Sequence, residues 1–384
     1  MNSTRRNALR FVAGSAVLLA AAGGTGVFWL NKRADRAIAP WAEAAAGAFA
    51  DWRMKALAYA VLAPNPHNRQ PWLLELRGTD MIRVYCELGR RLPVTDPFDR
   101  QIMIGFGAFL ELLRMAAAQD GVALAIETFP EGLPGDRLDR RPIAALRPVG
   151  DSAMADPLFA HVLERHTNRQ PYRTAAIPDE AVAMLRSALP AAPDFRLHTR
   201  GPELAALRDI TIAGFDREMR TPQAHLESVH LMRIGRAEID ANPDGIALDG
   251  PMIEFARLAG LVSAEALADP DNNAFRQGVD KLLASAQATP AFVSLCTTGN
   301  SREDQLDAGR DWIRLHLAAT GLGLAMQPMS QALQEYPEMA DLNQAIHTLL
   351  RPDGGRIQML GRIGYAPAQR PAPRWPVSSR LLDA

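Results

Sequence analysis

Two short polar motifs constrain this chain more than any other feature. The first is the loop 63–72, APNPHNRQPW, in which three prolines interrupt regular structure and side-chain amides gather on exposed backbone. The second is the segment 165–169, RHTNR, which places two guanidiniums and a hydroxyl within five residues and suits bidentate capture of a phosphate. Since amides complement the edge of a planar heteroaromatic ring, the two motifs together predict a site for flavin mononucleotide, FMN.

The same residues resemble a known family. The loop resembles the Ala-Pro-Ser-x-x-Asn-x-Gln-Pro-Trp signature of nitroreductase-like flavoproteins, and Arg165-x-Thr167-x-Arg169 resembles the Arg-x-Ser-x-Arg motif that opens the ordinary members. Ordinary members carry the arginine motif first and share each flavin between two identical subunits, whereas here the arginines follow the amide loop. This reversed order resembles the internally duplicated, Acg-like branch. The resemblance covers about Trp52 to Pro376 and is poor from about 216 to 290.

The resemblance implies an α+β fold of nitroreductase type, with two tandem fused halves and one complete site per chain. Each half is expected to hold an antiparallel-type sheet packed by helices. No residue-level repeat in the sequence is strong enough to establish the duplication. The expected divisions are a signal or anchor at 1–39, a first half at 40–150, and a second half at 151–384 with a lid insertion at about 221–290.

Periodicity and turn residues predict the elements of both halves. In the first half we expect helices at 41–62 and 99–119, strands at 72–77, 81–87 and 122–129, and a linker at 130–151. In the second half we expect helices at 157–164, 178–188, 203–220 and 303–320, and strands at 195–198, 291–297, 324–329 and 357–365. The stretch 221–290 is polar and weakly periodic, which favours a turn-rich lid.

Site residues are assigned partly by chemistry and partly by resemblance. Asn68 and Gln70 are expected at the ring edge, with turn capping as the alternative for each. By resemblance, Arg165 and Thr167 would bind the phosphate and Arg169 the pyrimidine end of the ring, with an inter-half salt-bridge cluster as the alternative. Resemblance also implies that the backbone and neighbouring tail bring further residues to the flavin: Gln327, Pro328, Met329 and Arg374. Arg374 could equally be an exposed tail residue; no catalytic residue and no metal site is assigned.

Composition and the N-terminal stretch bear on partners and location. A formal net charge of -1 argues against a nucleic-acid partner. Arg5-Arg6 precedes an uncharged run from Phe11 to Leu30, the layout of a twin-arginine export signal, although a transmembrane helix is the alternative. Because Pro40 follows the small-x-small site Ala37-Ile38-Ala39, cleavage is disfavoured and the segment is expected to stay as a membrane anchor. The body is then expected in the periplasm or on the periplasmic face of the inner membrane.

The leading hypothesis is an FMN-dependent oxidoreductase that reduces a small planar electron acceptor such as a quinone or nitroaromatic. Its donor could be NAD(P)H or a membrane quinol, since no Gly-x-Gly-x-x-Gly fingerprint for a separate dinucleotide site is present. A second hypothesis is a binding protein that sequesters the flavin under its lid without turnover. A third is a membrane-anchored scaffold in which the motifs persist only as structure.

Overall fold

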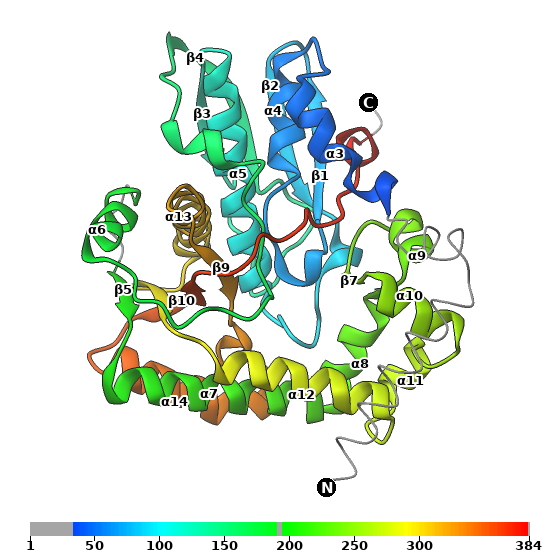
Figure 1. Ribbon diagram of the computed structural model, residues 1–384. Coiled ribbons are helices and arrows are strands. Elements are labelled where there is room, and N and C mark those ends of the chain that lie inside the picture. The colour runs from blue at the N-terminus through cyan, green and yellow to red at the C-terminus, as the bar shows by residue number, and fades with distance from the viewer. Residues whose placement is uncertain (1–33, 190–193, 383–384) are drawn as a thin grey trace, which may run out of the picture.

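The structure is a computed structural model that describes residues 34–189 and 194–382. The predicted signal or anchor up to residue 33 lies outside the described residues. The fold contains two four-stranded sheets in which every neighbouring pair is antiparallel, flanked by helices (Figure 1). This arrangement confirms the predicted α+β class.

The two sheets have the same strand order. The first has the order β1-β2-β4-β3, with β1 Trp72–Arg77, β2 Met81–Cys86, β3 Val122–Thr128 and β4 Ala144–Ser152. The second has the order β5-β8-β10-β9, with β5 Asp194–His198, β8 Phe292–Thr297, β9 Ala325–Pro328 and β10 Arg356–Gly364. Strand β2 alternates between buried and half-buried residues, as a strand with one core face should, whereas β8 is buried on both faces.

The helices that accompany each sheet also correspond. In the first half α4 (Trp52–Ala60) precedes β1, and α5 (Arg100–Gln119) joins β2 to β3. In the second half α6 (Asp179–Ser187) precedes β5, and α13 (Arg302–Gly321) joins β8 to β9. The order of these elements is therefore the same in both halves, apart from an insertion between β5 and β8 and the helix α14 (Ala340–Leu350) between β9 and β10, which has no counterpart between β3 and β4.

Helices α5 and α13 cross in contact near the middle of the molecule (Figure 1). A Cβ on Gly107 would lie 2.0 Å from the Leu306 carbonyl oxygen, and one on Gly309 would lie 2.0 Å from the Ile104 carbonyl oxygen. Only glycine permits so close an approach of two backbones. Helix α5 is also the one helix among the described residues long and apolar enough to cross a bilayer, but 89% of that stretch is buried in the core.

Two regions differ from the sequence-based expectation. The helix expected at 41–62 is two helices, α3 (Asp35–Ala46) and α4, because Gly47 ends α3 in the left-handed conformation and Asp51 caps α4. The linker expected at 130–151 is wrong in part, since β4 occupies Ala144–Ser152 and runs through the predicted boundary at 150. The Pro- and Arg-rich composition there concealed the buried residues Ala144 and Leu146, which alternate on the core face.

The segment 221–290 is not the turn-rich stretch that its composition suggested. It folds into helices and one parallel strand pair: α8 Pro222–His230, β6 Met232–Ile234, α9 Arg236–Ala241, β7 Ile246–Leu248, α10 Pro251–Leu258, α11 Ala264–Ala268 and α12 Asn273–Gln287. Most of these elements are too short to display a clear 3.6-residue period. Helix α12 packs along α7 (Gly201–Arg220), which also contacts α14 (Ala340–Leu350). Short 3-10 helices lie at Pro66–Asn68, Leu88–Arg90, Pro157–His161, Gln331–Leu333, Pro337–Met339 and Val377–Arg380.

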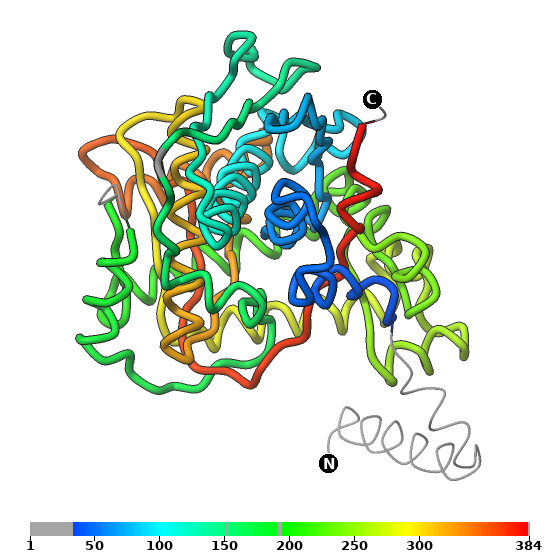
Figure 2. The backbone as a smooth tube through the Cα atoms, turned by 90° about the horizontal axis from the view of Figure 1, so that it is seen from above, coloured from blue at the N-terminus to red at the C-terminus, as the bar shows by residue number. Residues whose placement is uncertain are grey.

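After β10 the C-terminal tail, residues 365–382, returns from the second half to the first (Figure 2). The Arg374 amide donates to the Ala37 carbonyl over 2.7 Å, and the Leu382 amide donates to the Leu74 carbonyl over 2.7 Å. Leu381 also forms an isolated parallel bridge with Leu74 of β1. The tail thus fastens the two halves together and passes over the amide loop.

Candidate functional site

The amide loop is held in a strained conformation. His67, Asn68 and Gln70 all have positive φ, at 47°, 51° and 49°. Such conformations cost of order 1–3 kcal/mol each for ordinary residues and cluster at ligand sites. The Asn65 side chain helps to maintain the loop by accepting the Gln70 amide over 2.7 Å. The sequence region singled out for its amides is therefore also the place where backbone strain is concentrated.

Both predicted ring-edge amides are engaged by other parts of the protein. The Gln70 side chain is fully enclosed; its Nε2 donates to the Pro243 carbonyl over 2.7 Å and its Oε1 accepts the Trp375 amide over 2.8 Å. Asn68 Nδ2 donates to the Pro373 carbonyl over 3.1 Å. The two amides thus bind the tail and the insertion. Either amide could contact a flavin ring only after its hydrogen bonds to Pro373, Pro243 or Trp375 are broken.

Two buried guanidiniums meet at the end of helix α4. Arg165 and Arg374 are 2% and 3% exposed. Each donates to the Leu62 carbonyl, over 3.2 Å and 3.0 Å. Arg374 also donates to the Ala63 carbonyl over 3.1 Å and to Asn68 Oδ1 over 2.6 Å. The alternative of an exposed tail arginine is therefore wrong, because residue 374 lies inside the molecule.

Neither of these arginines forms an ion pair with any described carboxylate, and the Nε atom of each is buried without a hydrogen-bond partner. Burial lowers the pKa of Arg165 to about 10, and burial with the nearby Arg165 charge lowers the pKa of Arg374 to about 9. Unpaired buried cations are strongly unfavourable. A phosphate would supply the missing negative charge and accept from the free Nε groups, so these residues fit the phosphate of FMN.

The surroundings of the arginine pair add no negative charge. His166 packs edge-on against Trp41 with ring centroids 4.7 Å apart, and burial followed by the Arg165 and Arg374 charges lowers its pKa to about 4. His316 of α13 lies with Nδ1 3.5 Å from Arg165 Nη1, and burial holds its pKa well below the usual value. Both imidazoles are therefore uncharged near pH 7. The positive charge of the site comes from Arg165 and Arg374.

The arginine motif lies against strand β9. Thr167 forms an isolated bridge with Met326, and the Asn168 amide donates to the Met326 carbonyl over 2.9 Å. The motif is thus directly beside the predicted backbone segment, of which Gln327 and Met329 are buried and Pro328 is half-buried. The structure therefore brings the predicted phosphate motif and the predicted ring-facing backbone together.

Arg169 differs from the other arginines of the site because its surface is exposed. Burial nevertheless lowers the pKa of Arg169. Burial also lowers the pKa of His67 to about 4; Glu227 opposes this shift, and the charges of Arg69 and Arg169 add to it. The charge on Arg169 of the arginine motif therefore acts on His67 of the amide loop.

The insertion at 221–290 packs against the amide loop. Asp244 is buried and forms ion pairs with three arginines: Arg69, Arg90 and Arg233. The Gly245 amide donates to the Asn68 carbonyl over 3.2 Å. On α8, Ser228 Oγ lies 3.1 Å from His67 Nε2. These contacts could not be predicted from the sequence, because they join segments far apart in the chain and Asp244 alone resembles an ordinary turn residue.

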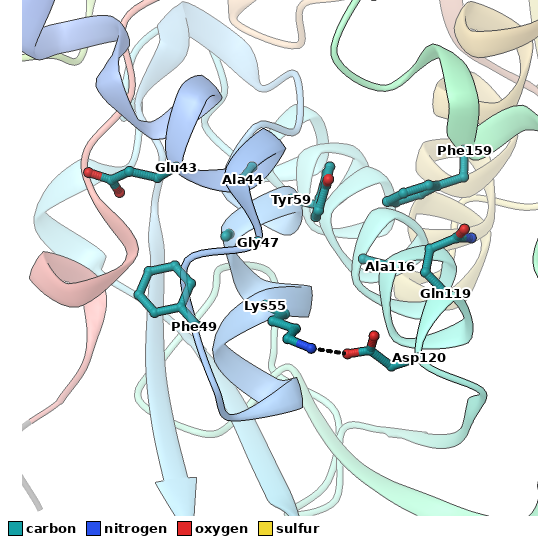
Figure 3. Close-up of a pocket in the computed structure, with 11 residues that line it drawn as sticks. Glu43, Ala44, Gly47, Phe49, Lys55, Tyr59, Ala116, Gln119, Asp120 and Phe159 are labelled. Carbon is teal, nitrogen blue, oxygen red and sulfur yellow. Dashed lines mark hydrogen bonds and ion pairs between the residues drawn. The ribbon is translucent and has the colours of Figure 1, made fainter.

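A separate hollow of about 200 Å³ lies between α3, α4 and the C-terminal end of α5 (Figure 3). Its lining includes Tyr59, Phe159 and an ion pair between Lys55 and Asp120 at 3.1 Å. None of the predicted site residues lines it. The hollow therefore does not coincide with the arginine pair.

Comparisons with known proteins agree with the resemblance. No family model matches the chain. A Mycobacterium tuberculosis protein provisionally named NAD(P)H nitroreductase Rv3131 is 26% identical over 322 residues, covering 81% of this chain and 84% of that protein. Another from the same organism, provisionally named NAD(P)H nitroreductase acg, is 30% identical over 168 residues, 41% of this chain and 47% of that protein. The chain is thus related in sequence to proteins named as nitroreductases.

Solved structures of nitroreductases also align with the chain, but loosely. FMN-dependent nitroreductase NfnB from Mycobacterium smegmatis, in complex with NADPH, has 18% identity and a TM-score of 0.36, covering 58% of this chain and 96% of that one. A nitroreductase with bound FMN from Bacteroides fragilis has 12% identity and a TM-score of 0.33, covering 55% and 89%. At TM-scores this low the superpositions carry no weight for the fold or the site.

Proposed function

We propose that the protein is an FMN-dependent oxidoreductase of nitroreductase type, which takes two electrons from NAD(P)H and delivers them to a small planar acceptor such as a quinone or nitroaromatic. The observation that carries the proposal is the pair of buried arginines, Arg165 and Arg374, without a carboxylate partner. Sequence relatives named NAD(P)H nitroreductases support both the reaction class and the donor.

The residues of the site have distinct roles under this proposal. Arg165 and Arg374, with the Thr167 hydroxyl, hold the phosphate, and Arg169 lies toward the pyrimidine end of the ring. The backbone at 327–329 approaches the ring, while Asn68 and Gln70 maintain the strained loop. When bound, FMN supplies the hydride chemistry by accepting two electrons from the donor and passing them on. A fixed cation at Arg169 stabilises negative charge on the reduced ring.

We also propose that the chain consists of two tandem halves with one site between them. The support is the common strand order of the two sheets, the equal lengths of α5 and α13, and the glycine crossing at Gly107 and Gly309. Arg165 and Thr167 come from the second half, and the amide loop comes from the first. Fusion would then replace the pairing of two subunits.

We further propose that the protein is exported by the twin-arginine route and keeps its N-terminal segment as a membrane anchor. The small-x-small site Ala37-Ile38-Ala39 lies within helix α3, where Ala37 is 1% exposed and its carbonyl accepts the Arg374 amide over 2.7 Å. Cleavage after Ala39 would remove this contact with the tail that carries Arg374. Retention of the segment is therefore consistent with an intact phosphate site.

A second candidate function, flavin sequestration, is favoured by one observation: the insertion contacts the amide loop directly through Gly245 and Ser228. An insertion packed against the amide loop would exclude an electron acceptor while the flavin stays bound. The two functions make opposite predictions about turnover.

Anaerobic reduction of the detergent-solubilised full chain distinguishes them. For the oxidoreductase, NAD(P)H bleaches the visible flavin absorbance and a quinone restores it, with repeated turnover. Bleaching by dithionite but by neither NAD(P)H nor a quinol would favour sequestration. A colourless protein that takes up no added FMN would overturn both, and the Arg165→Ala/Arg374→Ala double variant provides the control for site-specific binding.

A further inference from the structure

Helix α10 exposes apolar side chains to solvent and buries an acidic one. Its residues Met252 and Leu258 are 54% and 56% exposed, and Leu261 in the following turn is 49% exposed. At 100° per residue, half-buried Phe255 lies between Met252 and Leu258 on the same outward face. No charged residue of α10 lies on this face. We name Met252, Phe255, Leu258 and Leu261 the α10 apolar face.

The acidic residue of α10 is turned inward, and the arginine that pairs with it is half-buried. Glu254 is 1% exposed, accepts the Arg236 amide over 2.5 Å and pairs with Arg257 Nη2 at 3.2 Å. Rotating the helix to hide the apolar face would break the hydrogen bond from the Arg236 amide and carry the buried Glu254 carboxylate toward the surface. The Glu254–Arg257 pair lies within the helix and would turn with it. The outward orientation of the apolar side chains is therefore built into the packing, and an exposed apolar group of this kind marks an interaction surface.

The described chain begins beside this region. Ala34 and Ala37 pack with Ile239 of α9 and Ala247 of β7, and the Ala37 amide donates to Asp240 Oδ1 over 3.0 Å. Strand β7 ends at Leu248, three residues before α10 starts at Pro251. The chain thus enters the fold against α9 and β7, in the same insertion as α10 (Figure 1).

The sequence before this entry point limits how far the body can lie from a membrane. The uncharged run ends at Leu30, and only Asn31, Lys32 and Arg33 separate it from Ala34. Four residues span at most about 14 Å when fully extended. If the run is held in a bilayer, the surface around Ala34 must lie against that bilayer.

We propose that the α10 apolar face rests in the interfacial layer of the bilayer that holds the N-terminal run, as a second and peripheral membrane contact. The occupant is lipid, because at most about 14 Å of chain separates the run from Ala34, and Ala34 packs on the same insertion that carries this face. Interfacial binding of this kind depends on an apolar helix face with its polar groups satisfied elsewhere. The inference rests on the proposed membrane attachment and not on flavin chemistry.

Site-directed fluorescence tests the contact in the full chain. The described cysteines, Cys86 and Cys296, are buried, so a Leu258→Cys variant can be labelled selectively with a polarity-sensitive dye. The protein is reconstituted with vesicles of phosphatidylethanolamine and phosphatidylglycerol that carry a nitroxide-labelled lipid. Met184→Cys on α6, a residue 51% exposed in the second half, is the matched control.

The proposal predicts a blue-shifted emission at position 258 and quenching by the labelled lipid several-fold stronger than at position 184. Equal weak quenching at both positions in protein that floats with the vesicles would overturn it, as would protein that fails to float. A blue shift without lipid quenching would show that protein covers the face, either a second copy or the N-terminal run, and would also overturn it. Flavin absorbance, recorded in parallel, keeps a failure of the proposed function distinct from a failure of this contact.

Discussion

At the scale of single residues, the proposed flavin site depends on the buried positive charges of Arg165 and Arg374, which pair with no described carboxylate. The arginine motif in the sequence predicts that Arg165 binds the phosphate. For Arg374 the sequence leaves two possibilities equally open, a place at the flavin or an exposed position on the tail. Its burial depends on the path of the tail, and its partners at Leu62 and Ala63 are backbone carbonyls just beyond the end of helix α4. No side-chain pattern in a sequence reveals which free carbonyls a distant arginine will meet.

Replacing Arg374 with glutamine should weaken FMN binding by about 10- to 100-fold, because a hydrogen bond to a charged group contributes about 1.5–3 kcal/mol. Riboflavin, which lacks the phosphate, should bind wild type and variant with similar affinity. Fluorescence titration of the apoprotein with each flavin measures both effects.

The control for that titration is Arg370→Gln, a tail residue whose side chain is 46% exposed and which pairs loosely with Asp249 at 3.6 Å. It should leave FMN affinity unchanged. Equal losses for FMN and riboflavin in Arg374→Gln would mean that residue 374 supports the tail and not the phosphate.

Glu218 of α7 gives a pH-dependent prediction. It is 3% exposed, and burial raises its pKa from 4.5 to about 7, while Gln334 Nε2 donates a long hydrogen bond of 3.5 Å to its Oε1. The folded state thus holds a proton that the unfolded state releases above pH 4.5. Stability contributed by this group is lost as pH rises from about 4.5 to about 7, by roughly 3 kcal/mol in all.

Glu218→Gln should therefore unfold at higher urea concentration than wild type at pH 8 and behave similarly at pH 5. Glu127→Gln, at an exposed position on β3, is the control and should shift the urea midpoints at pH 5 and pH 8 by the same small amount. Parallel curves for wild type and Glu218→Gln would show that the carboxyl is ionised in the folded protein.

At the scale of elements, the α5 and α13 crossing is the tightest contact between the halves. Gly309→Ala places a methyl group 2.0 Å from the Ile104 carbonyl oxygen. Because backbone on both sides must move, unfolding free energy should fall by about 3 kcal/mol or more. Thermal and urea unfolding measure the loss.

Gly278→Ala is the matched control, since Gly278 also lies inside a helix, α12, and a Cβ there meets nothing within 4 Å. Helix propensity predicts a small gain of roughly 0.5–1 kcal/mol for it. Equal changes in stability for both variants would contradict a close backbone approach at Gly309.

Long elements were the most predictable part of this fold. The expected helices at 99–119 and 303–320 correspond to α5 (Arg100–Gln119) and α13 (Arg302–Gly321), because twenty residues give a clear apolar period. The insertion was misjudged because most of its helices are short and depend on caps, such as Ser263 of α11, and on contacts with the amide loop. Helix α12, with 15 residues, is the exception and was also missed. Strand β4 was missed because proline and arginine occupy its exposed positions.

At the scale of the whole molecule, the site is assembled by segments that meet only after folding. The amide loop comes from the first half, the arginine motif from the second, and Arg374 from the tail that crosses between them (Figure 2). The sequence indicated which residue types belong together. Their real partners, including the tail contacts made by Asn68 and Gln70, depend on tertiary packing that local patterns do not contain.

The central claim is that one chain builds one FMN site. Sedimentation velocity of the full chain in detergent, followed at the protein and flavin absorbance bands, tests it most directly. We predict a single boundary with the mass of one chain and one FMN per chain. Flavin confined to a two-chain species, or protein that carries none after incubation with FMN, would contradict the account.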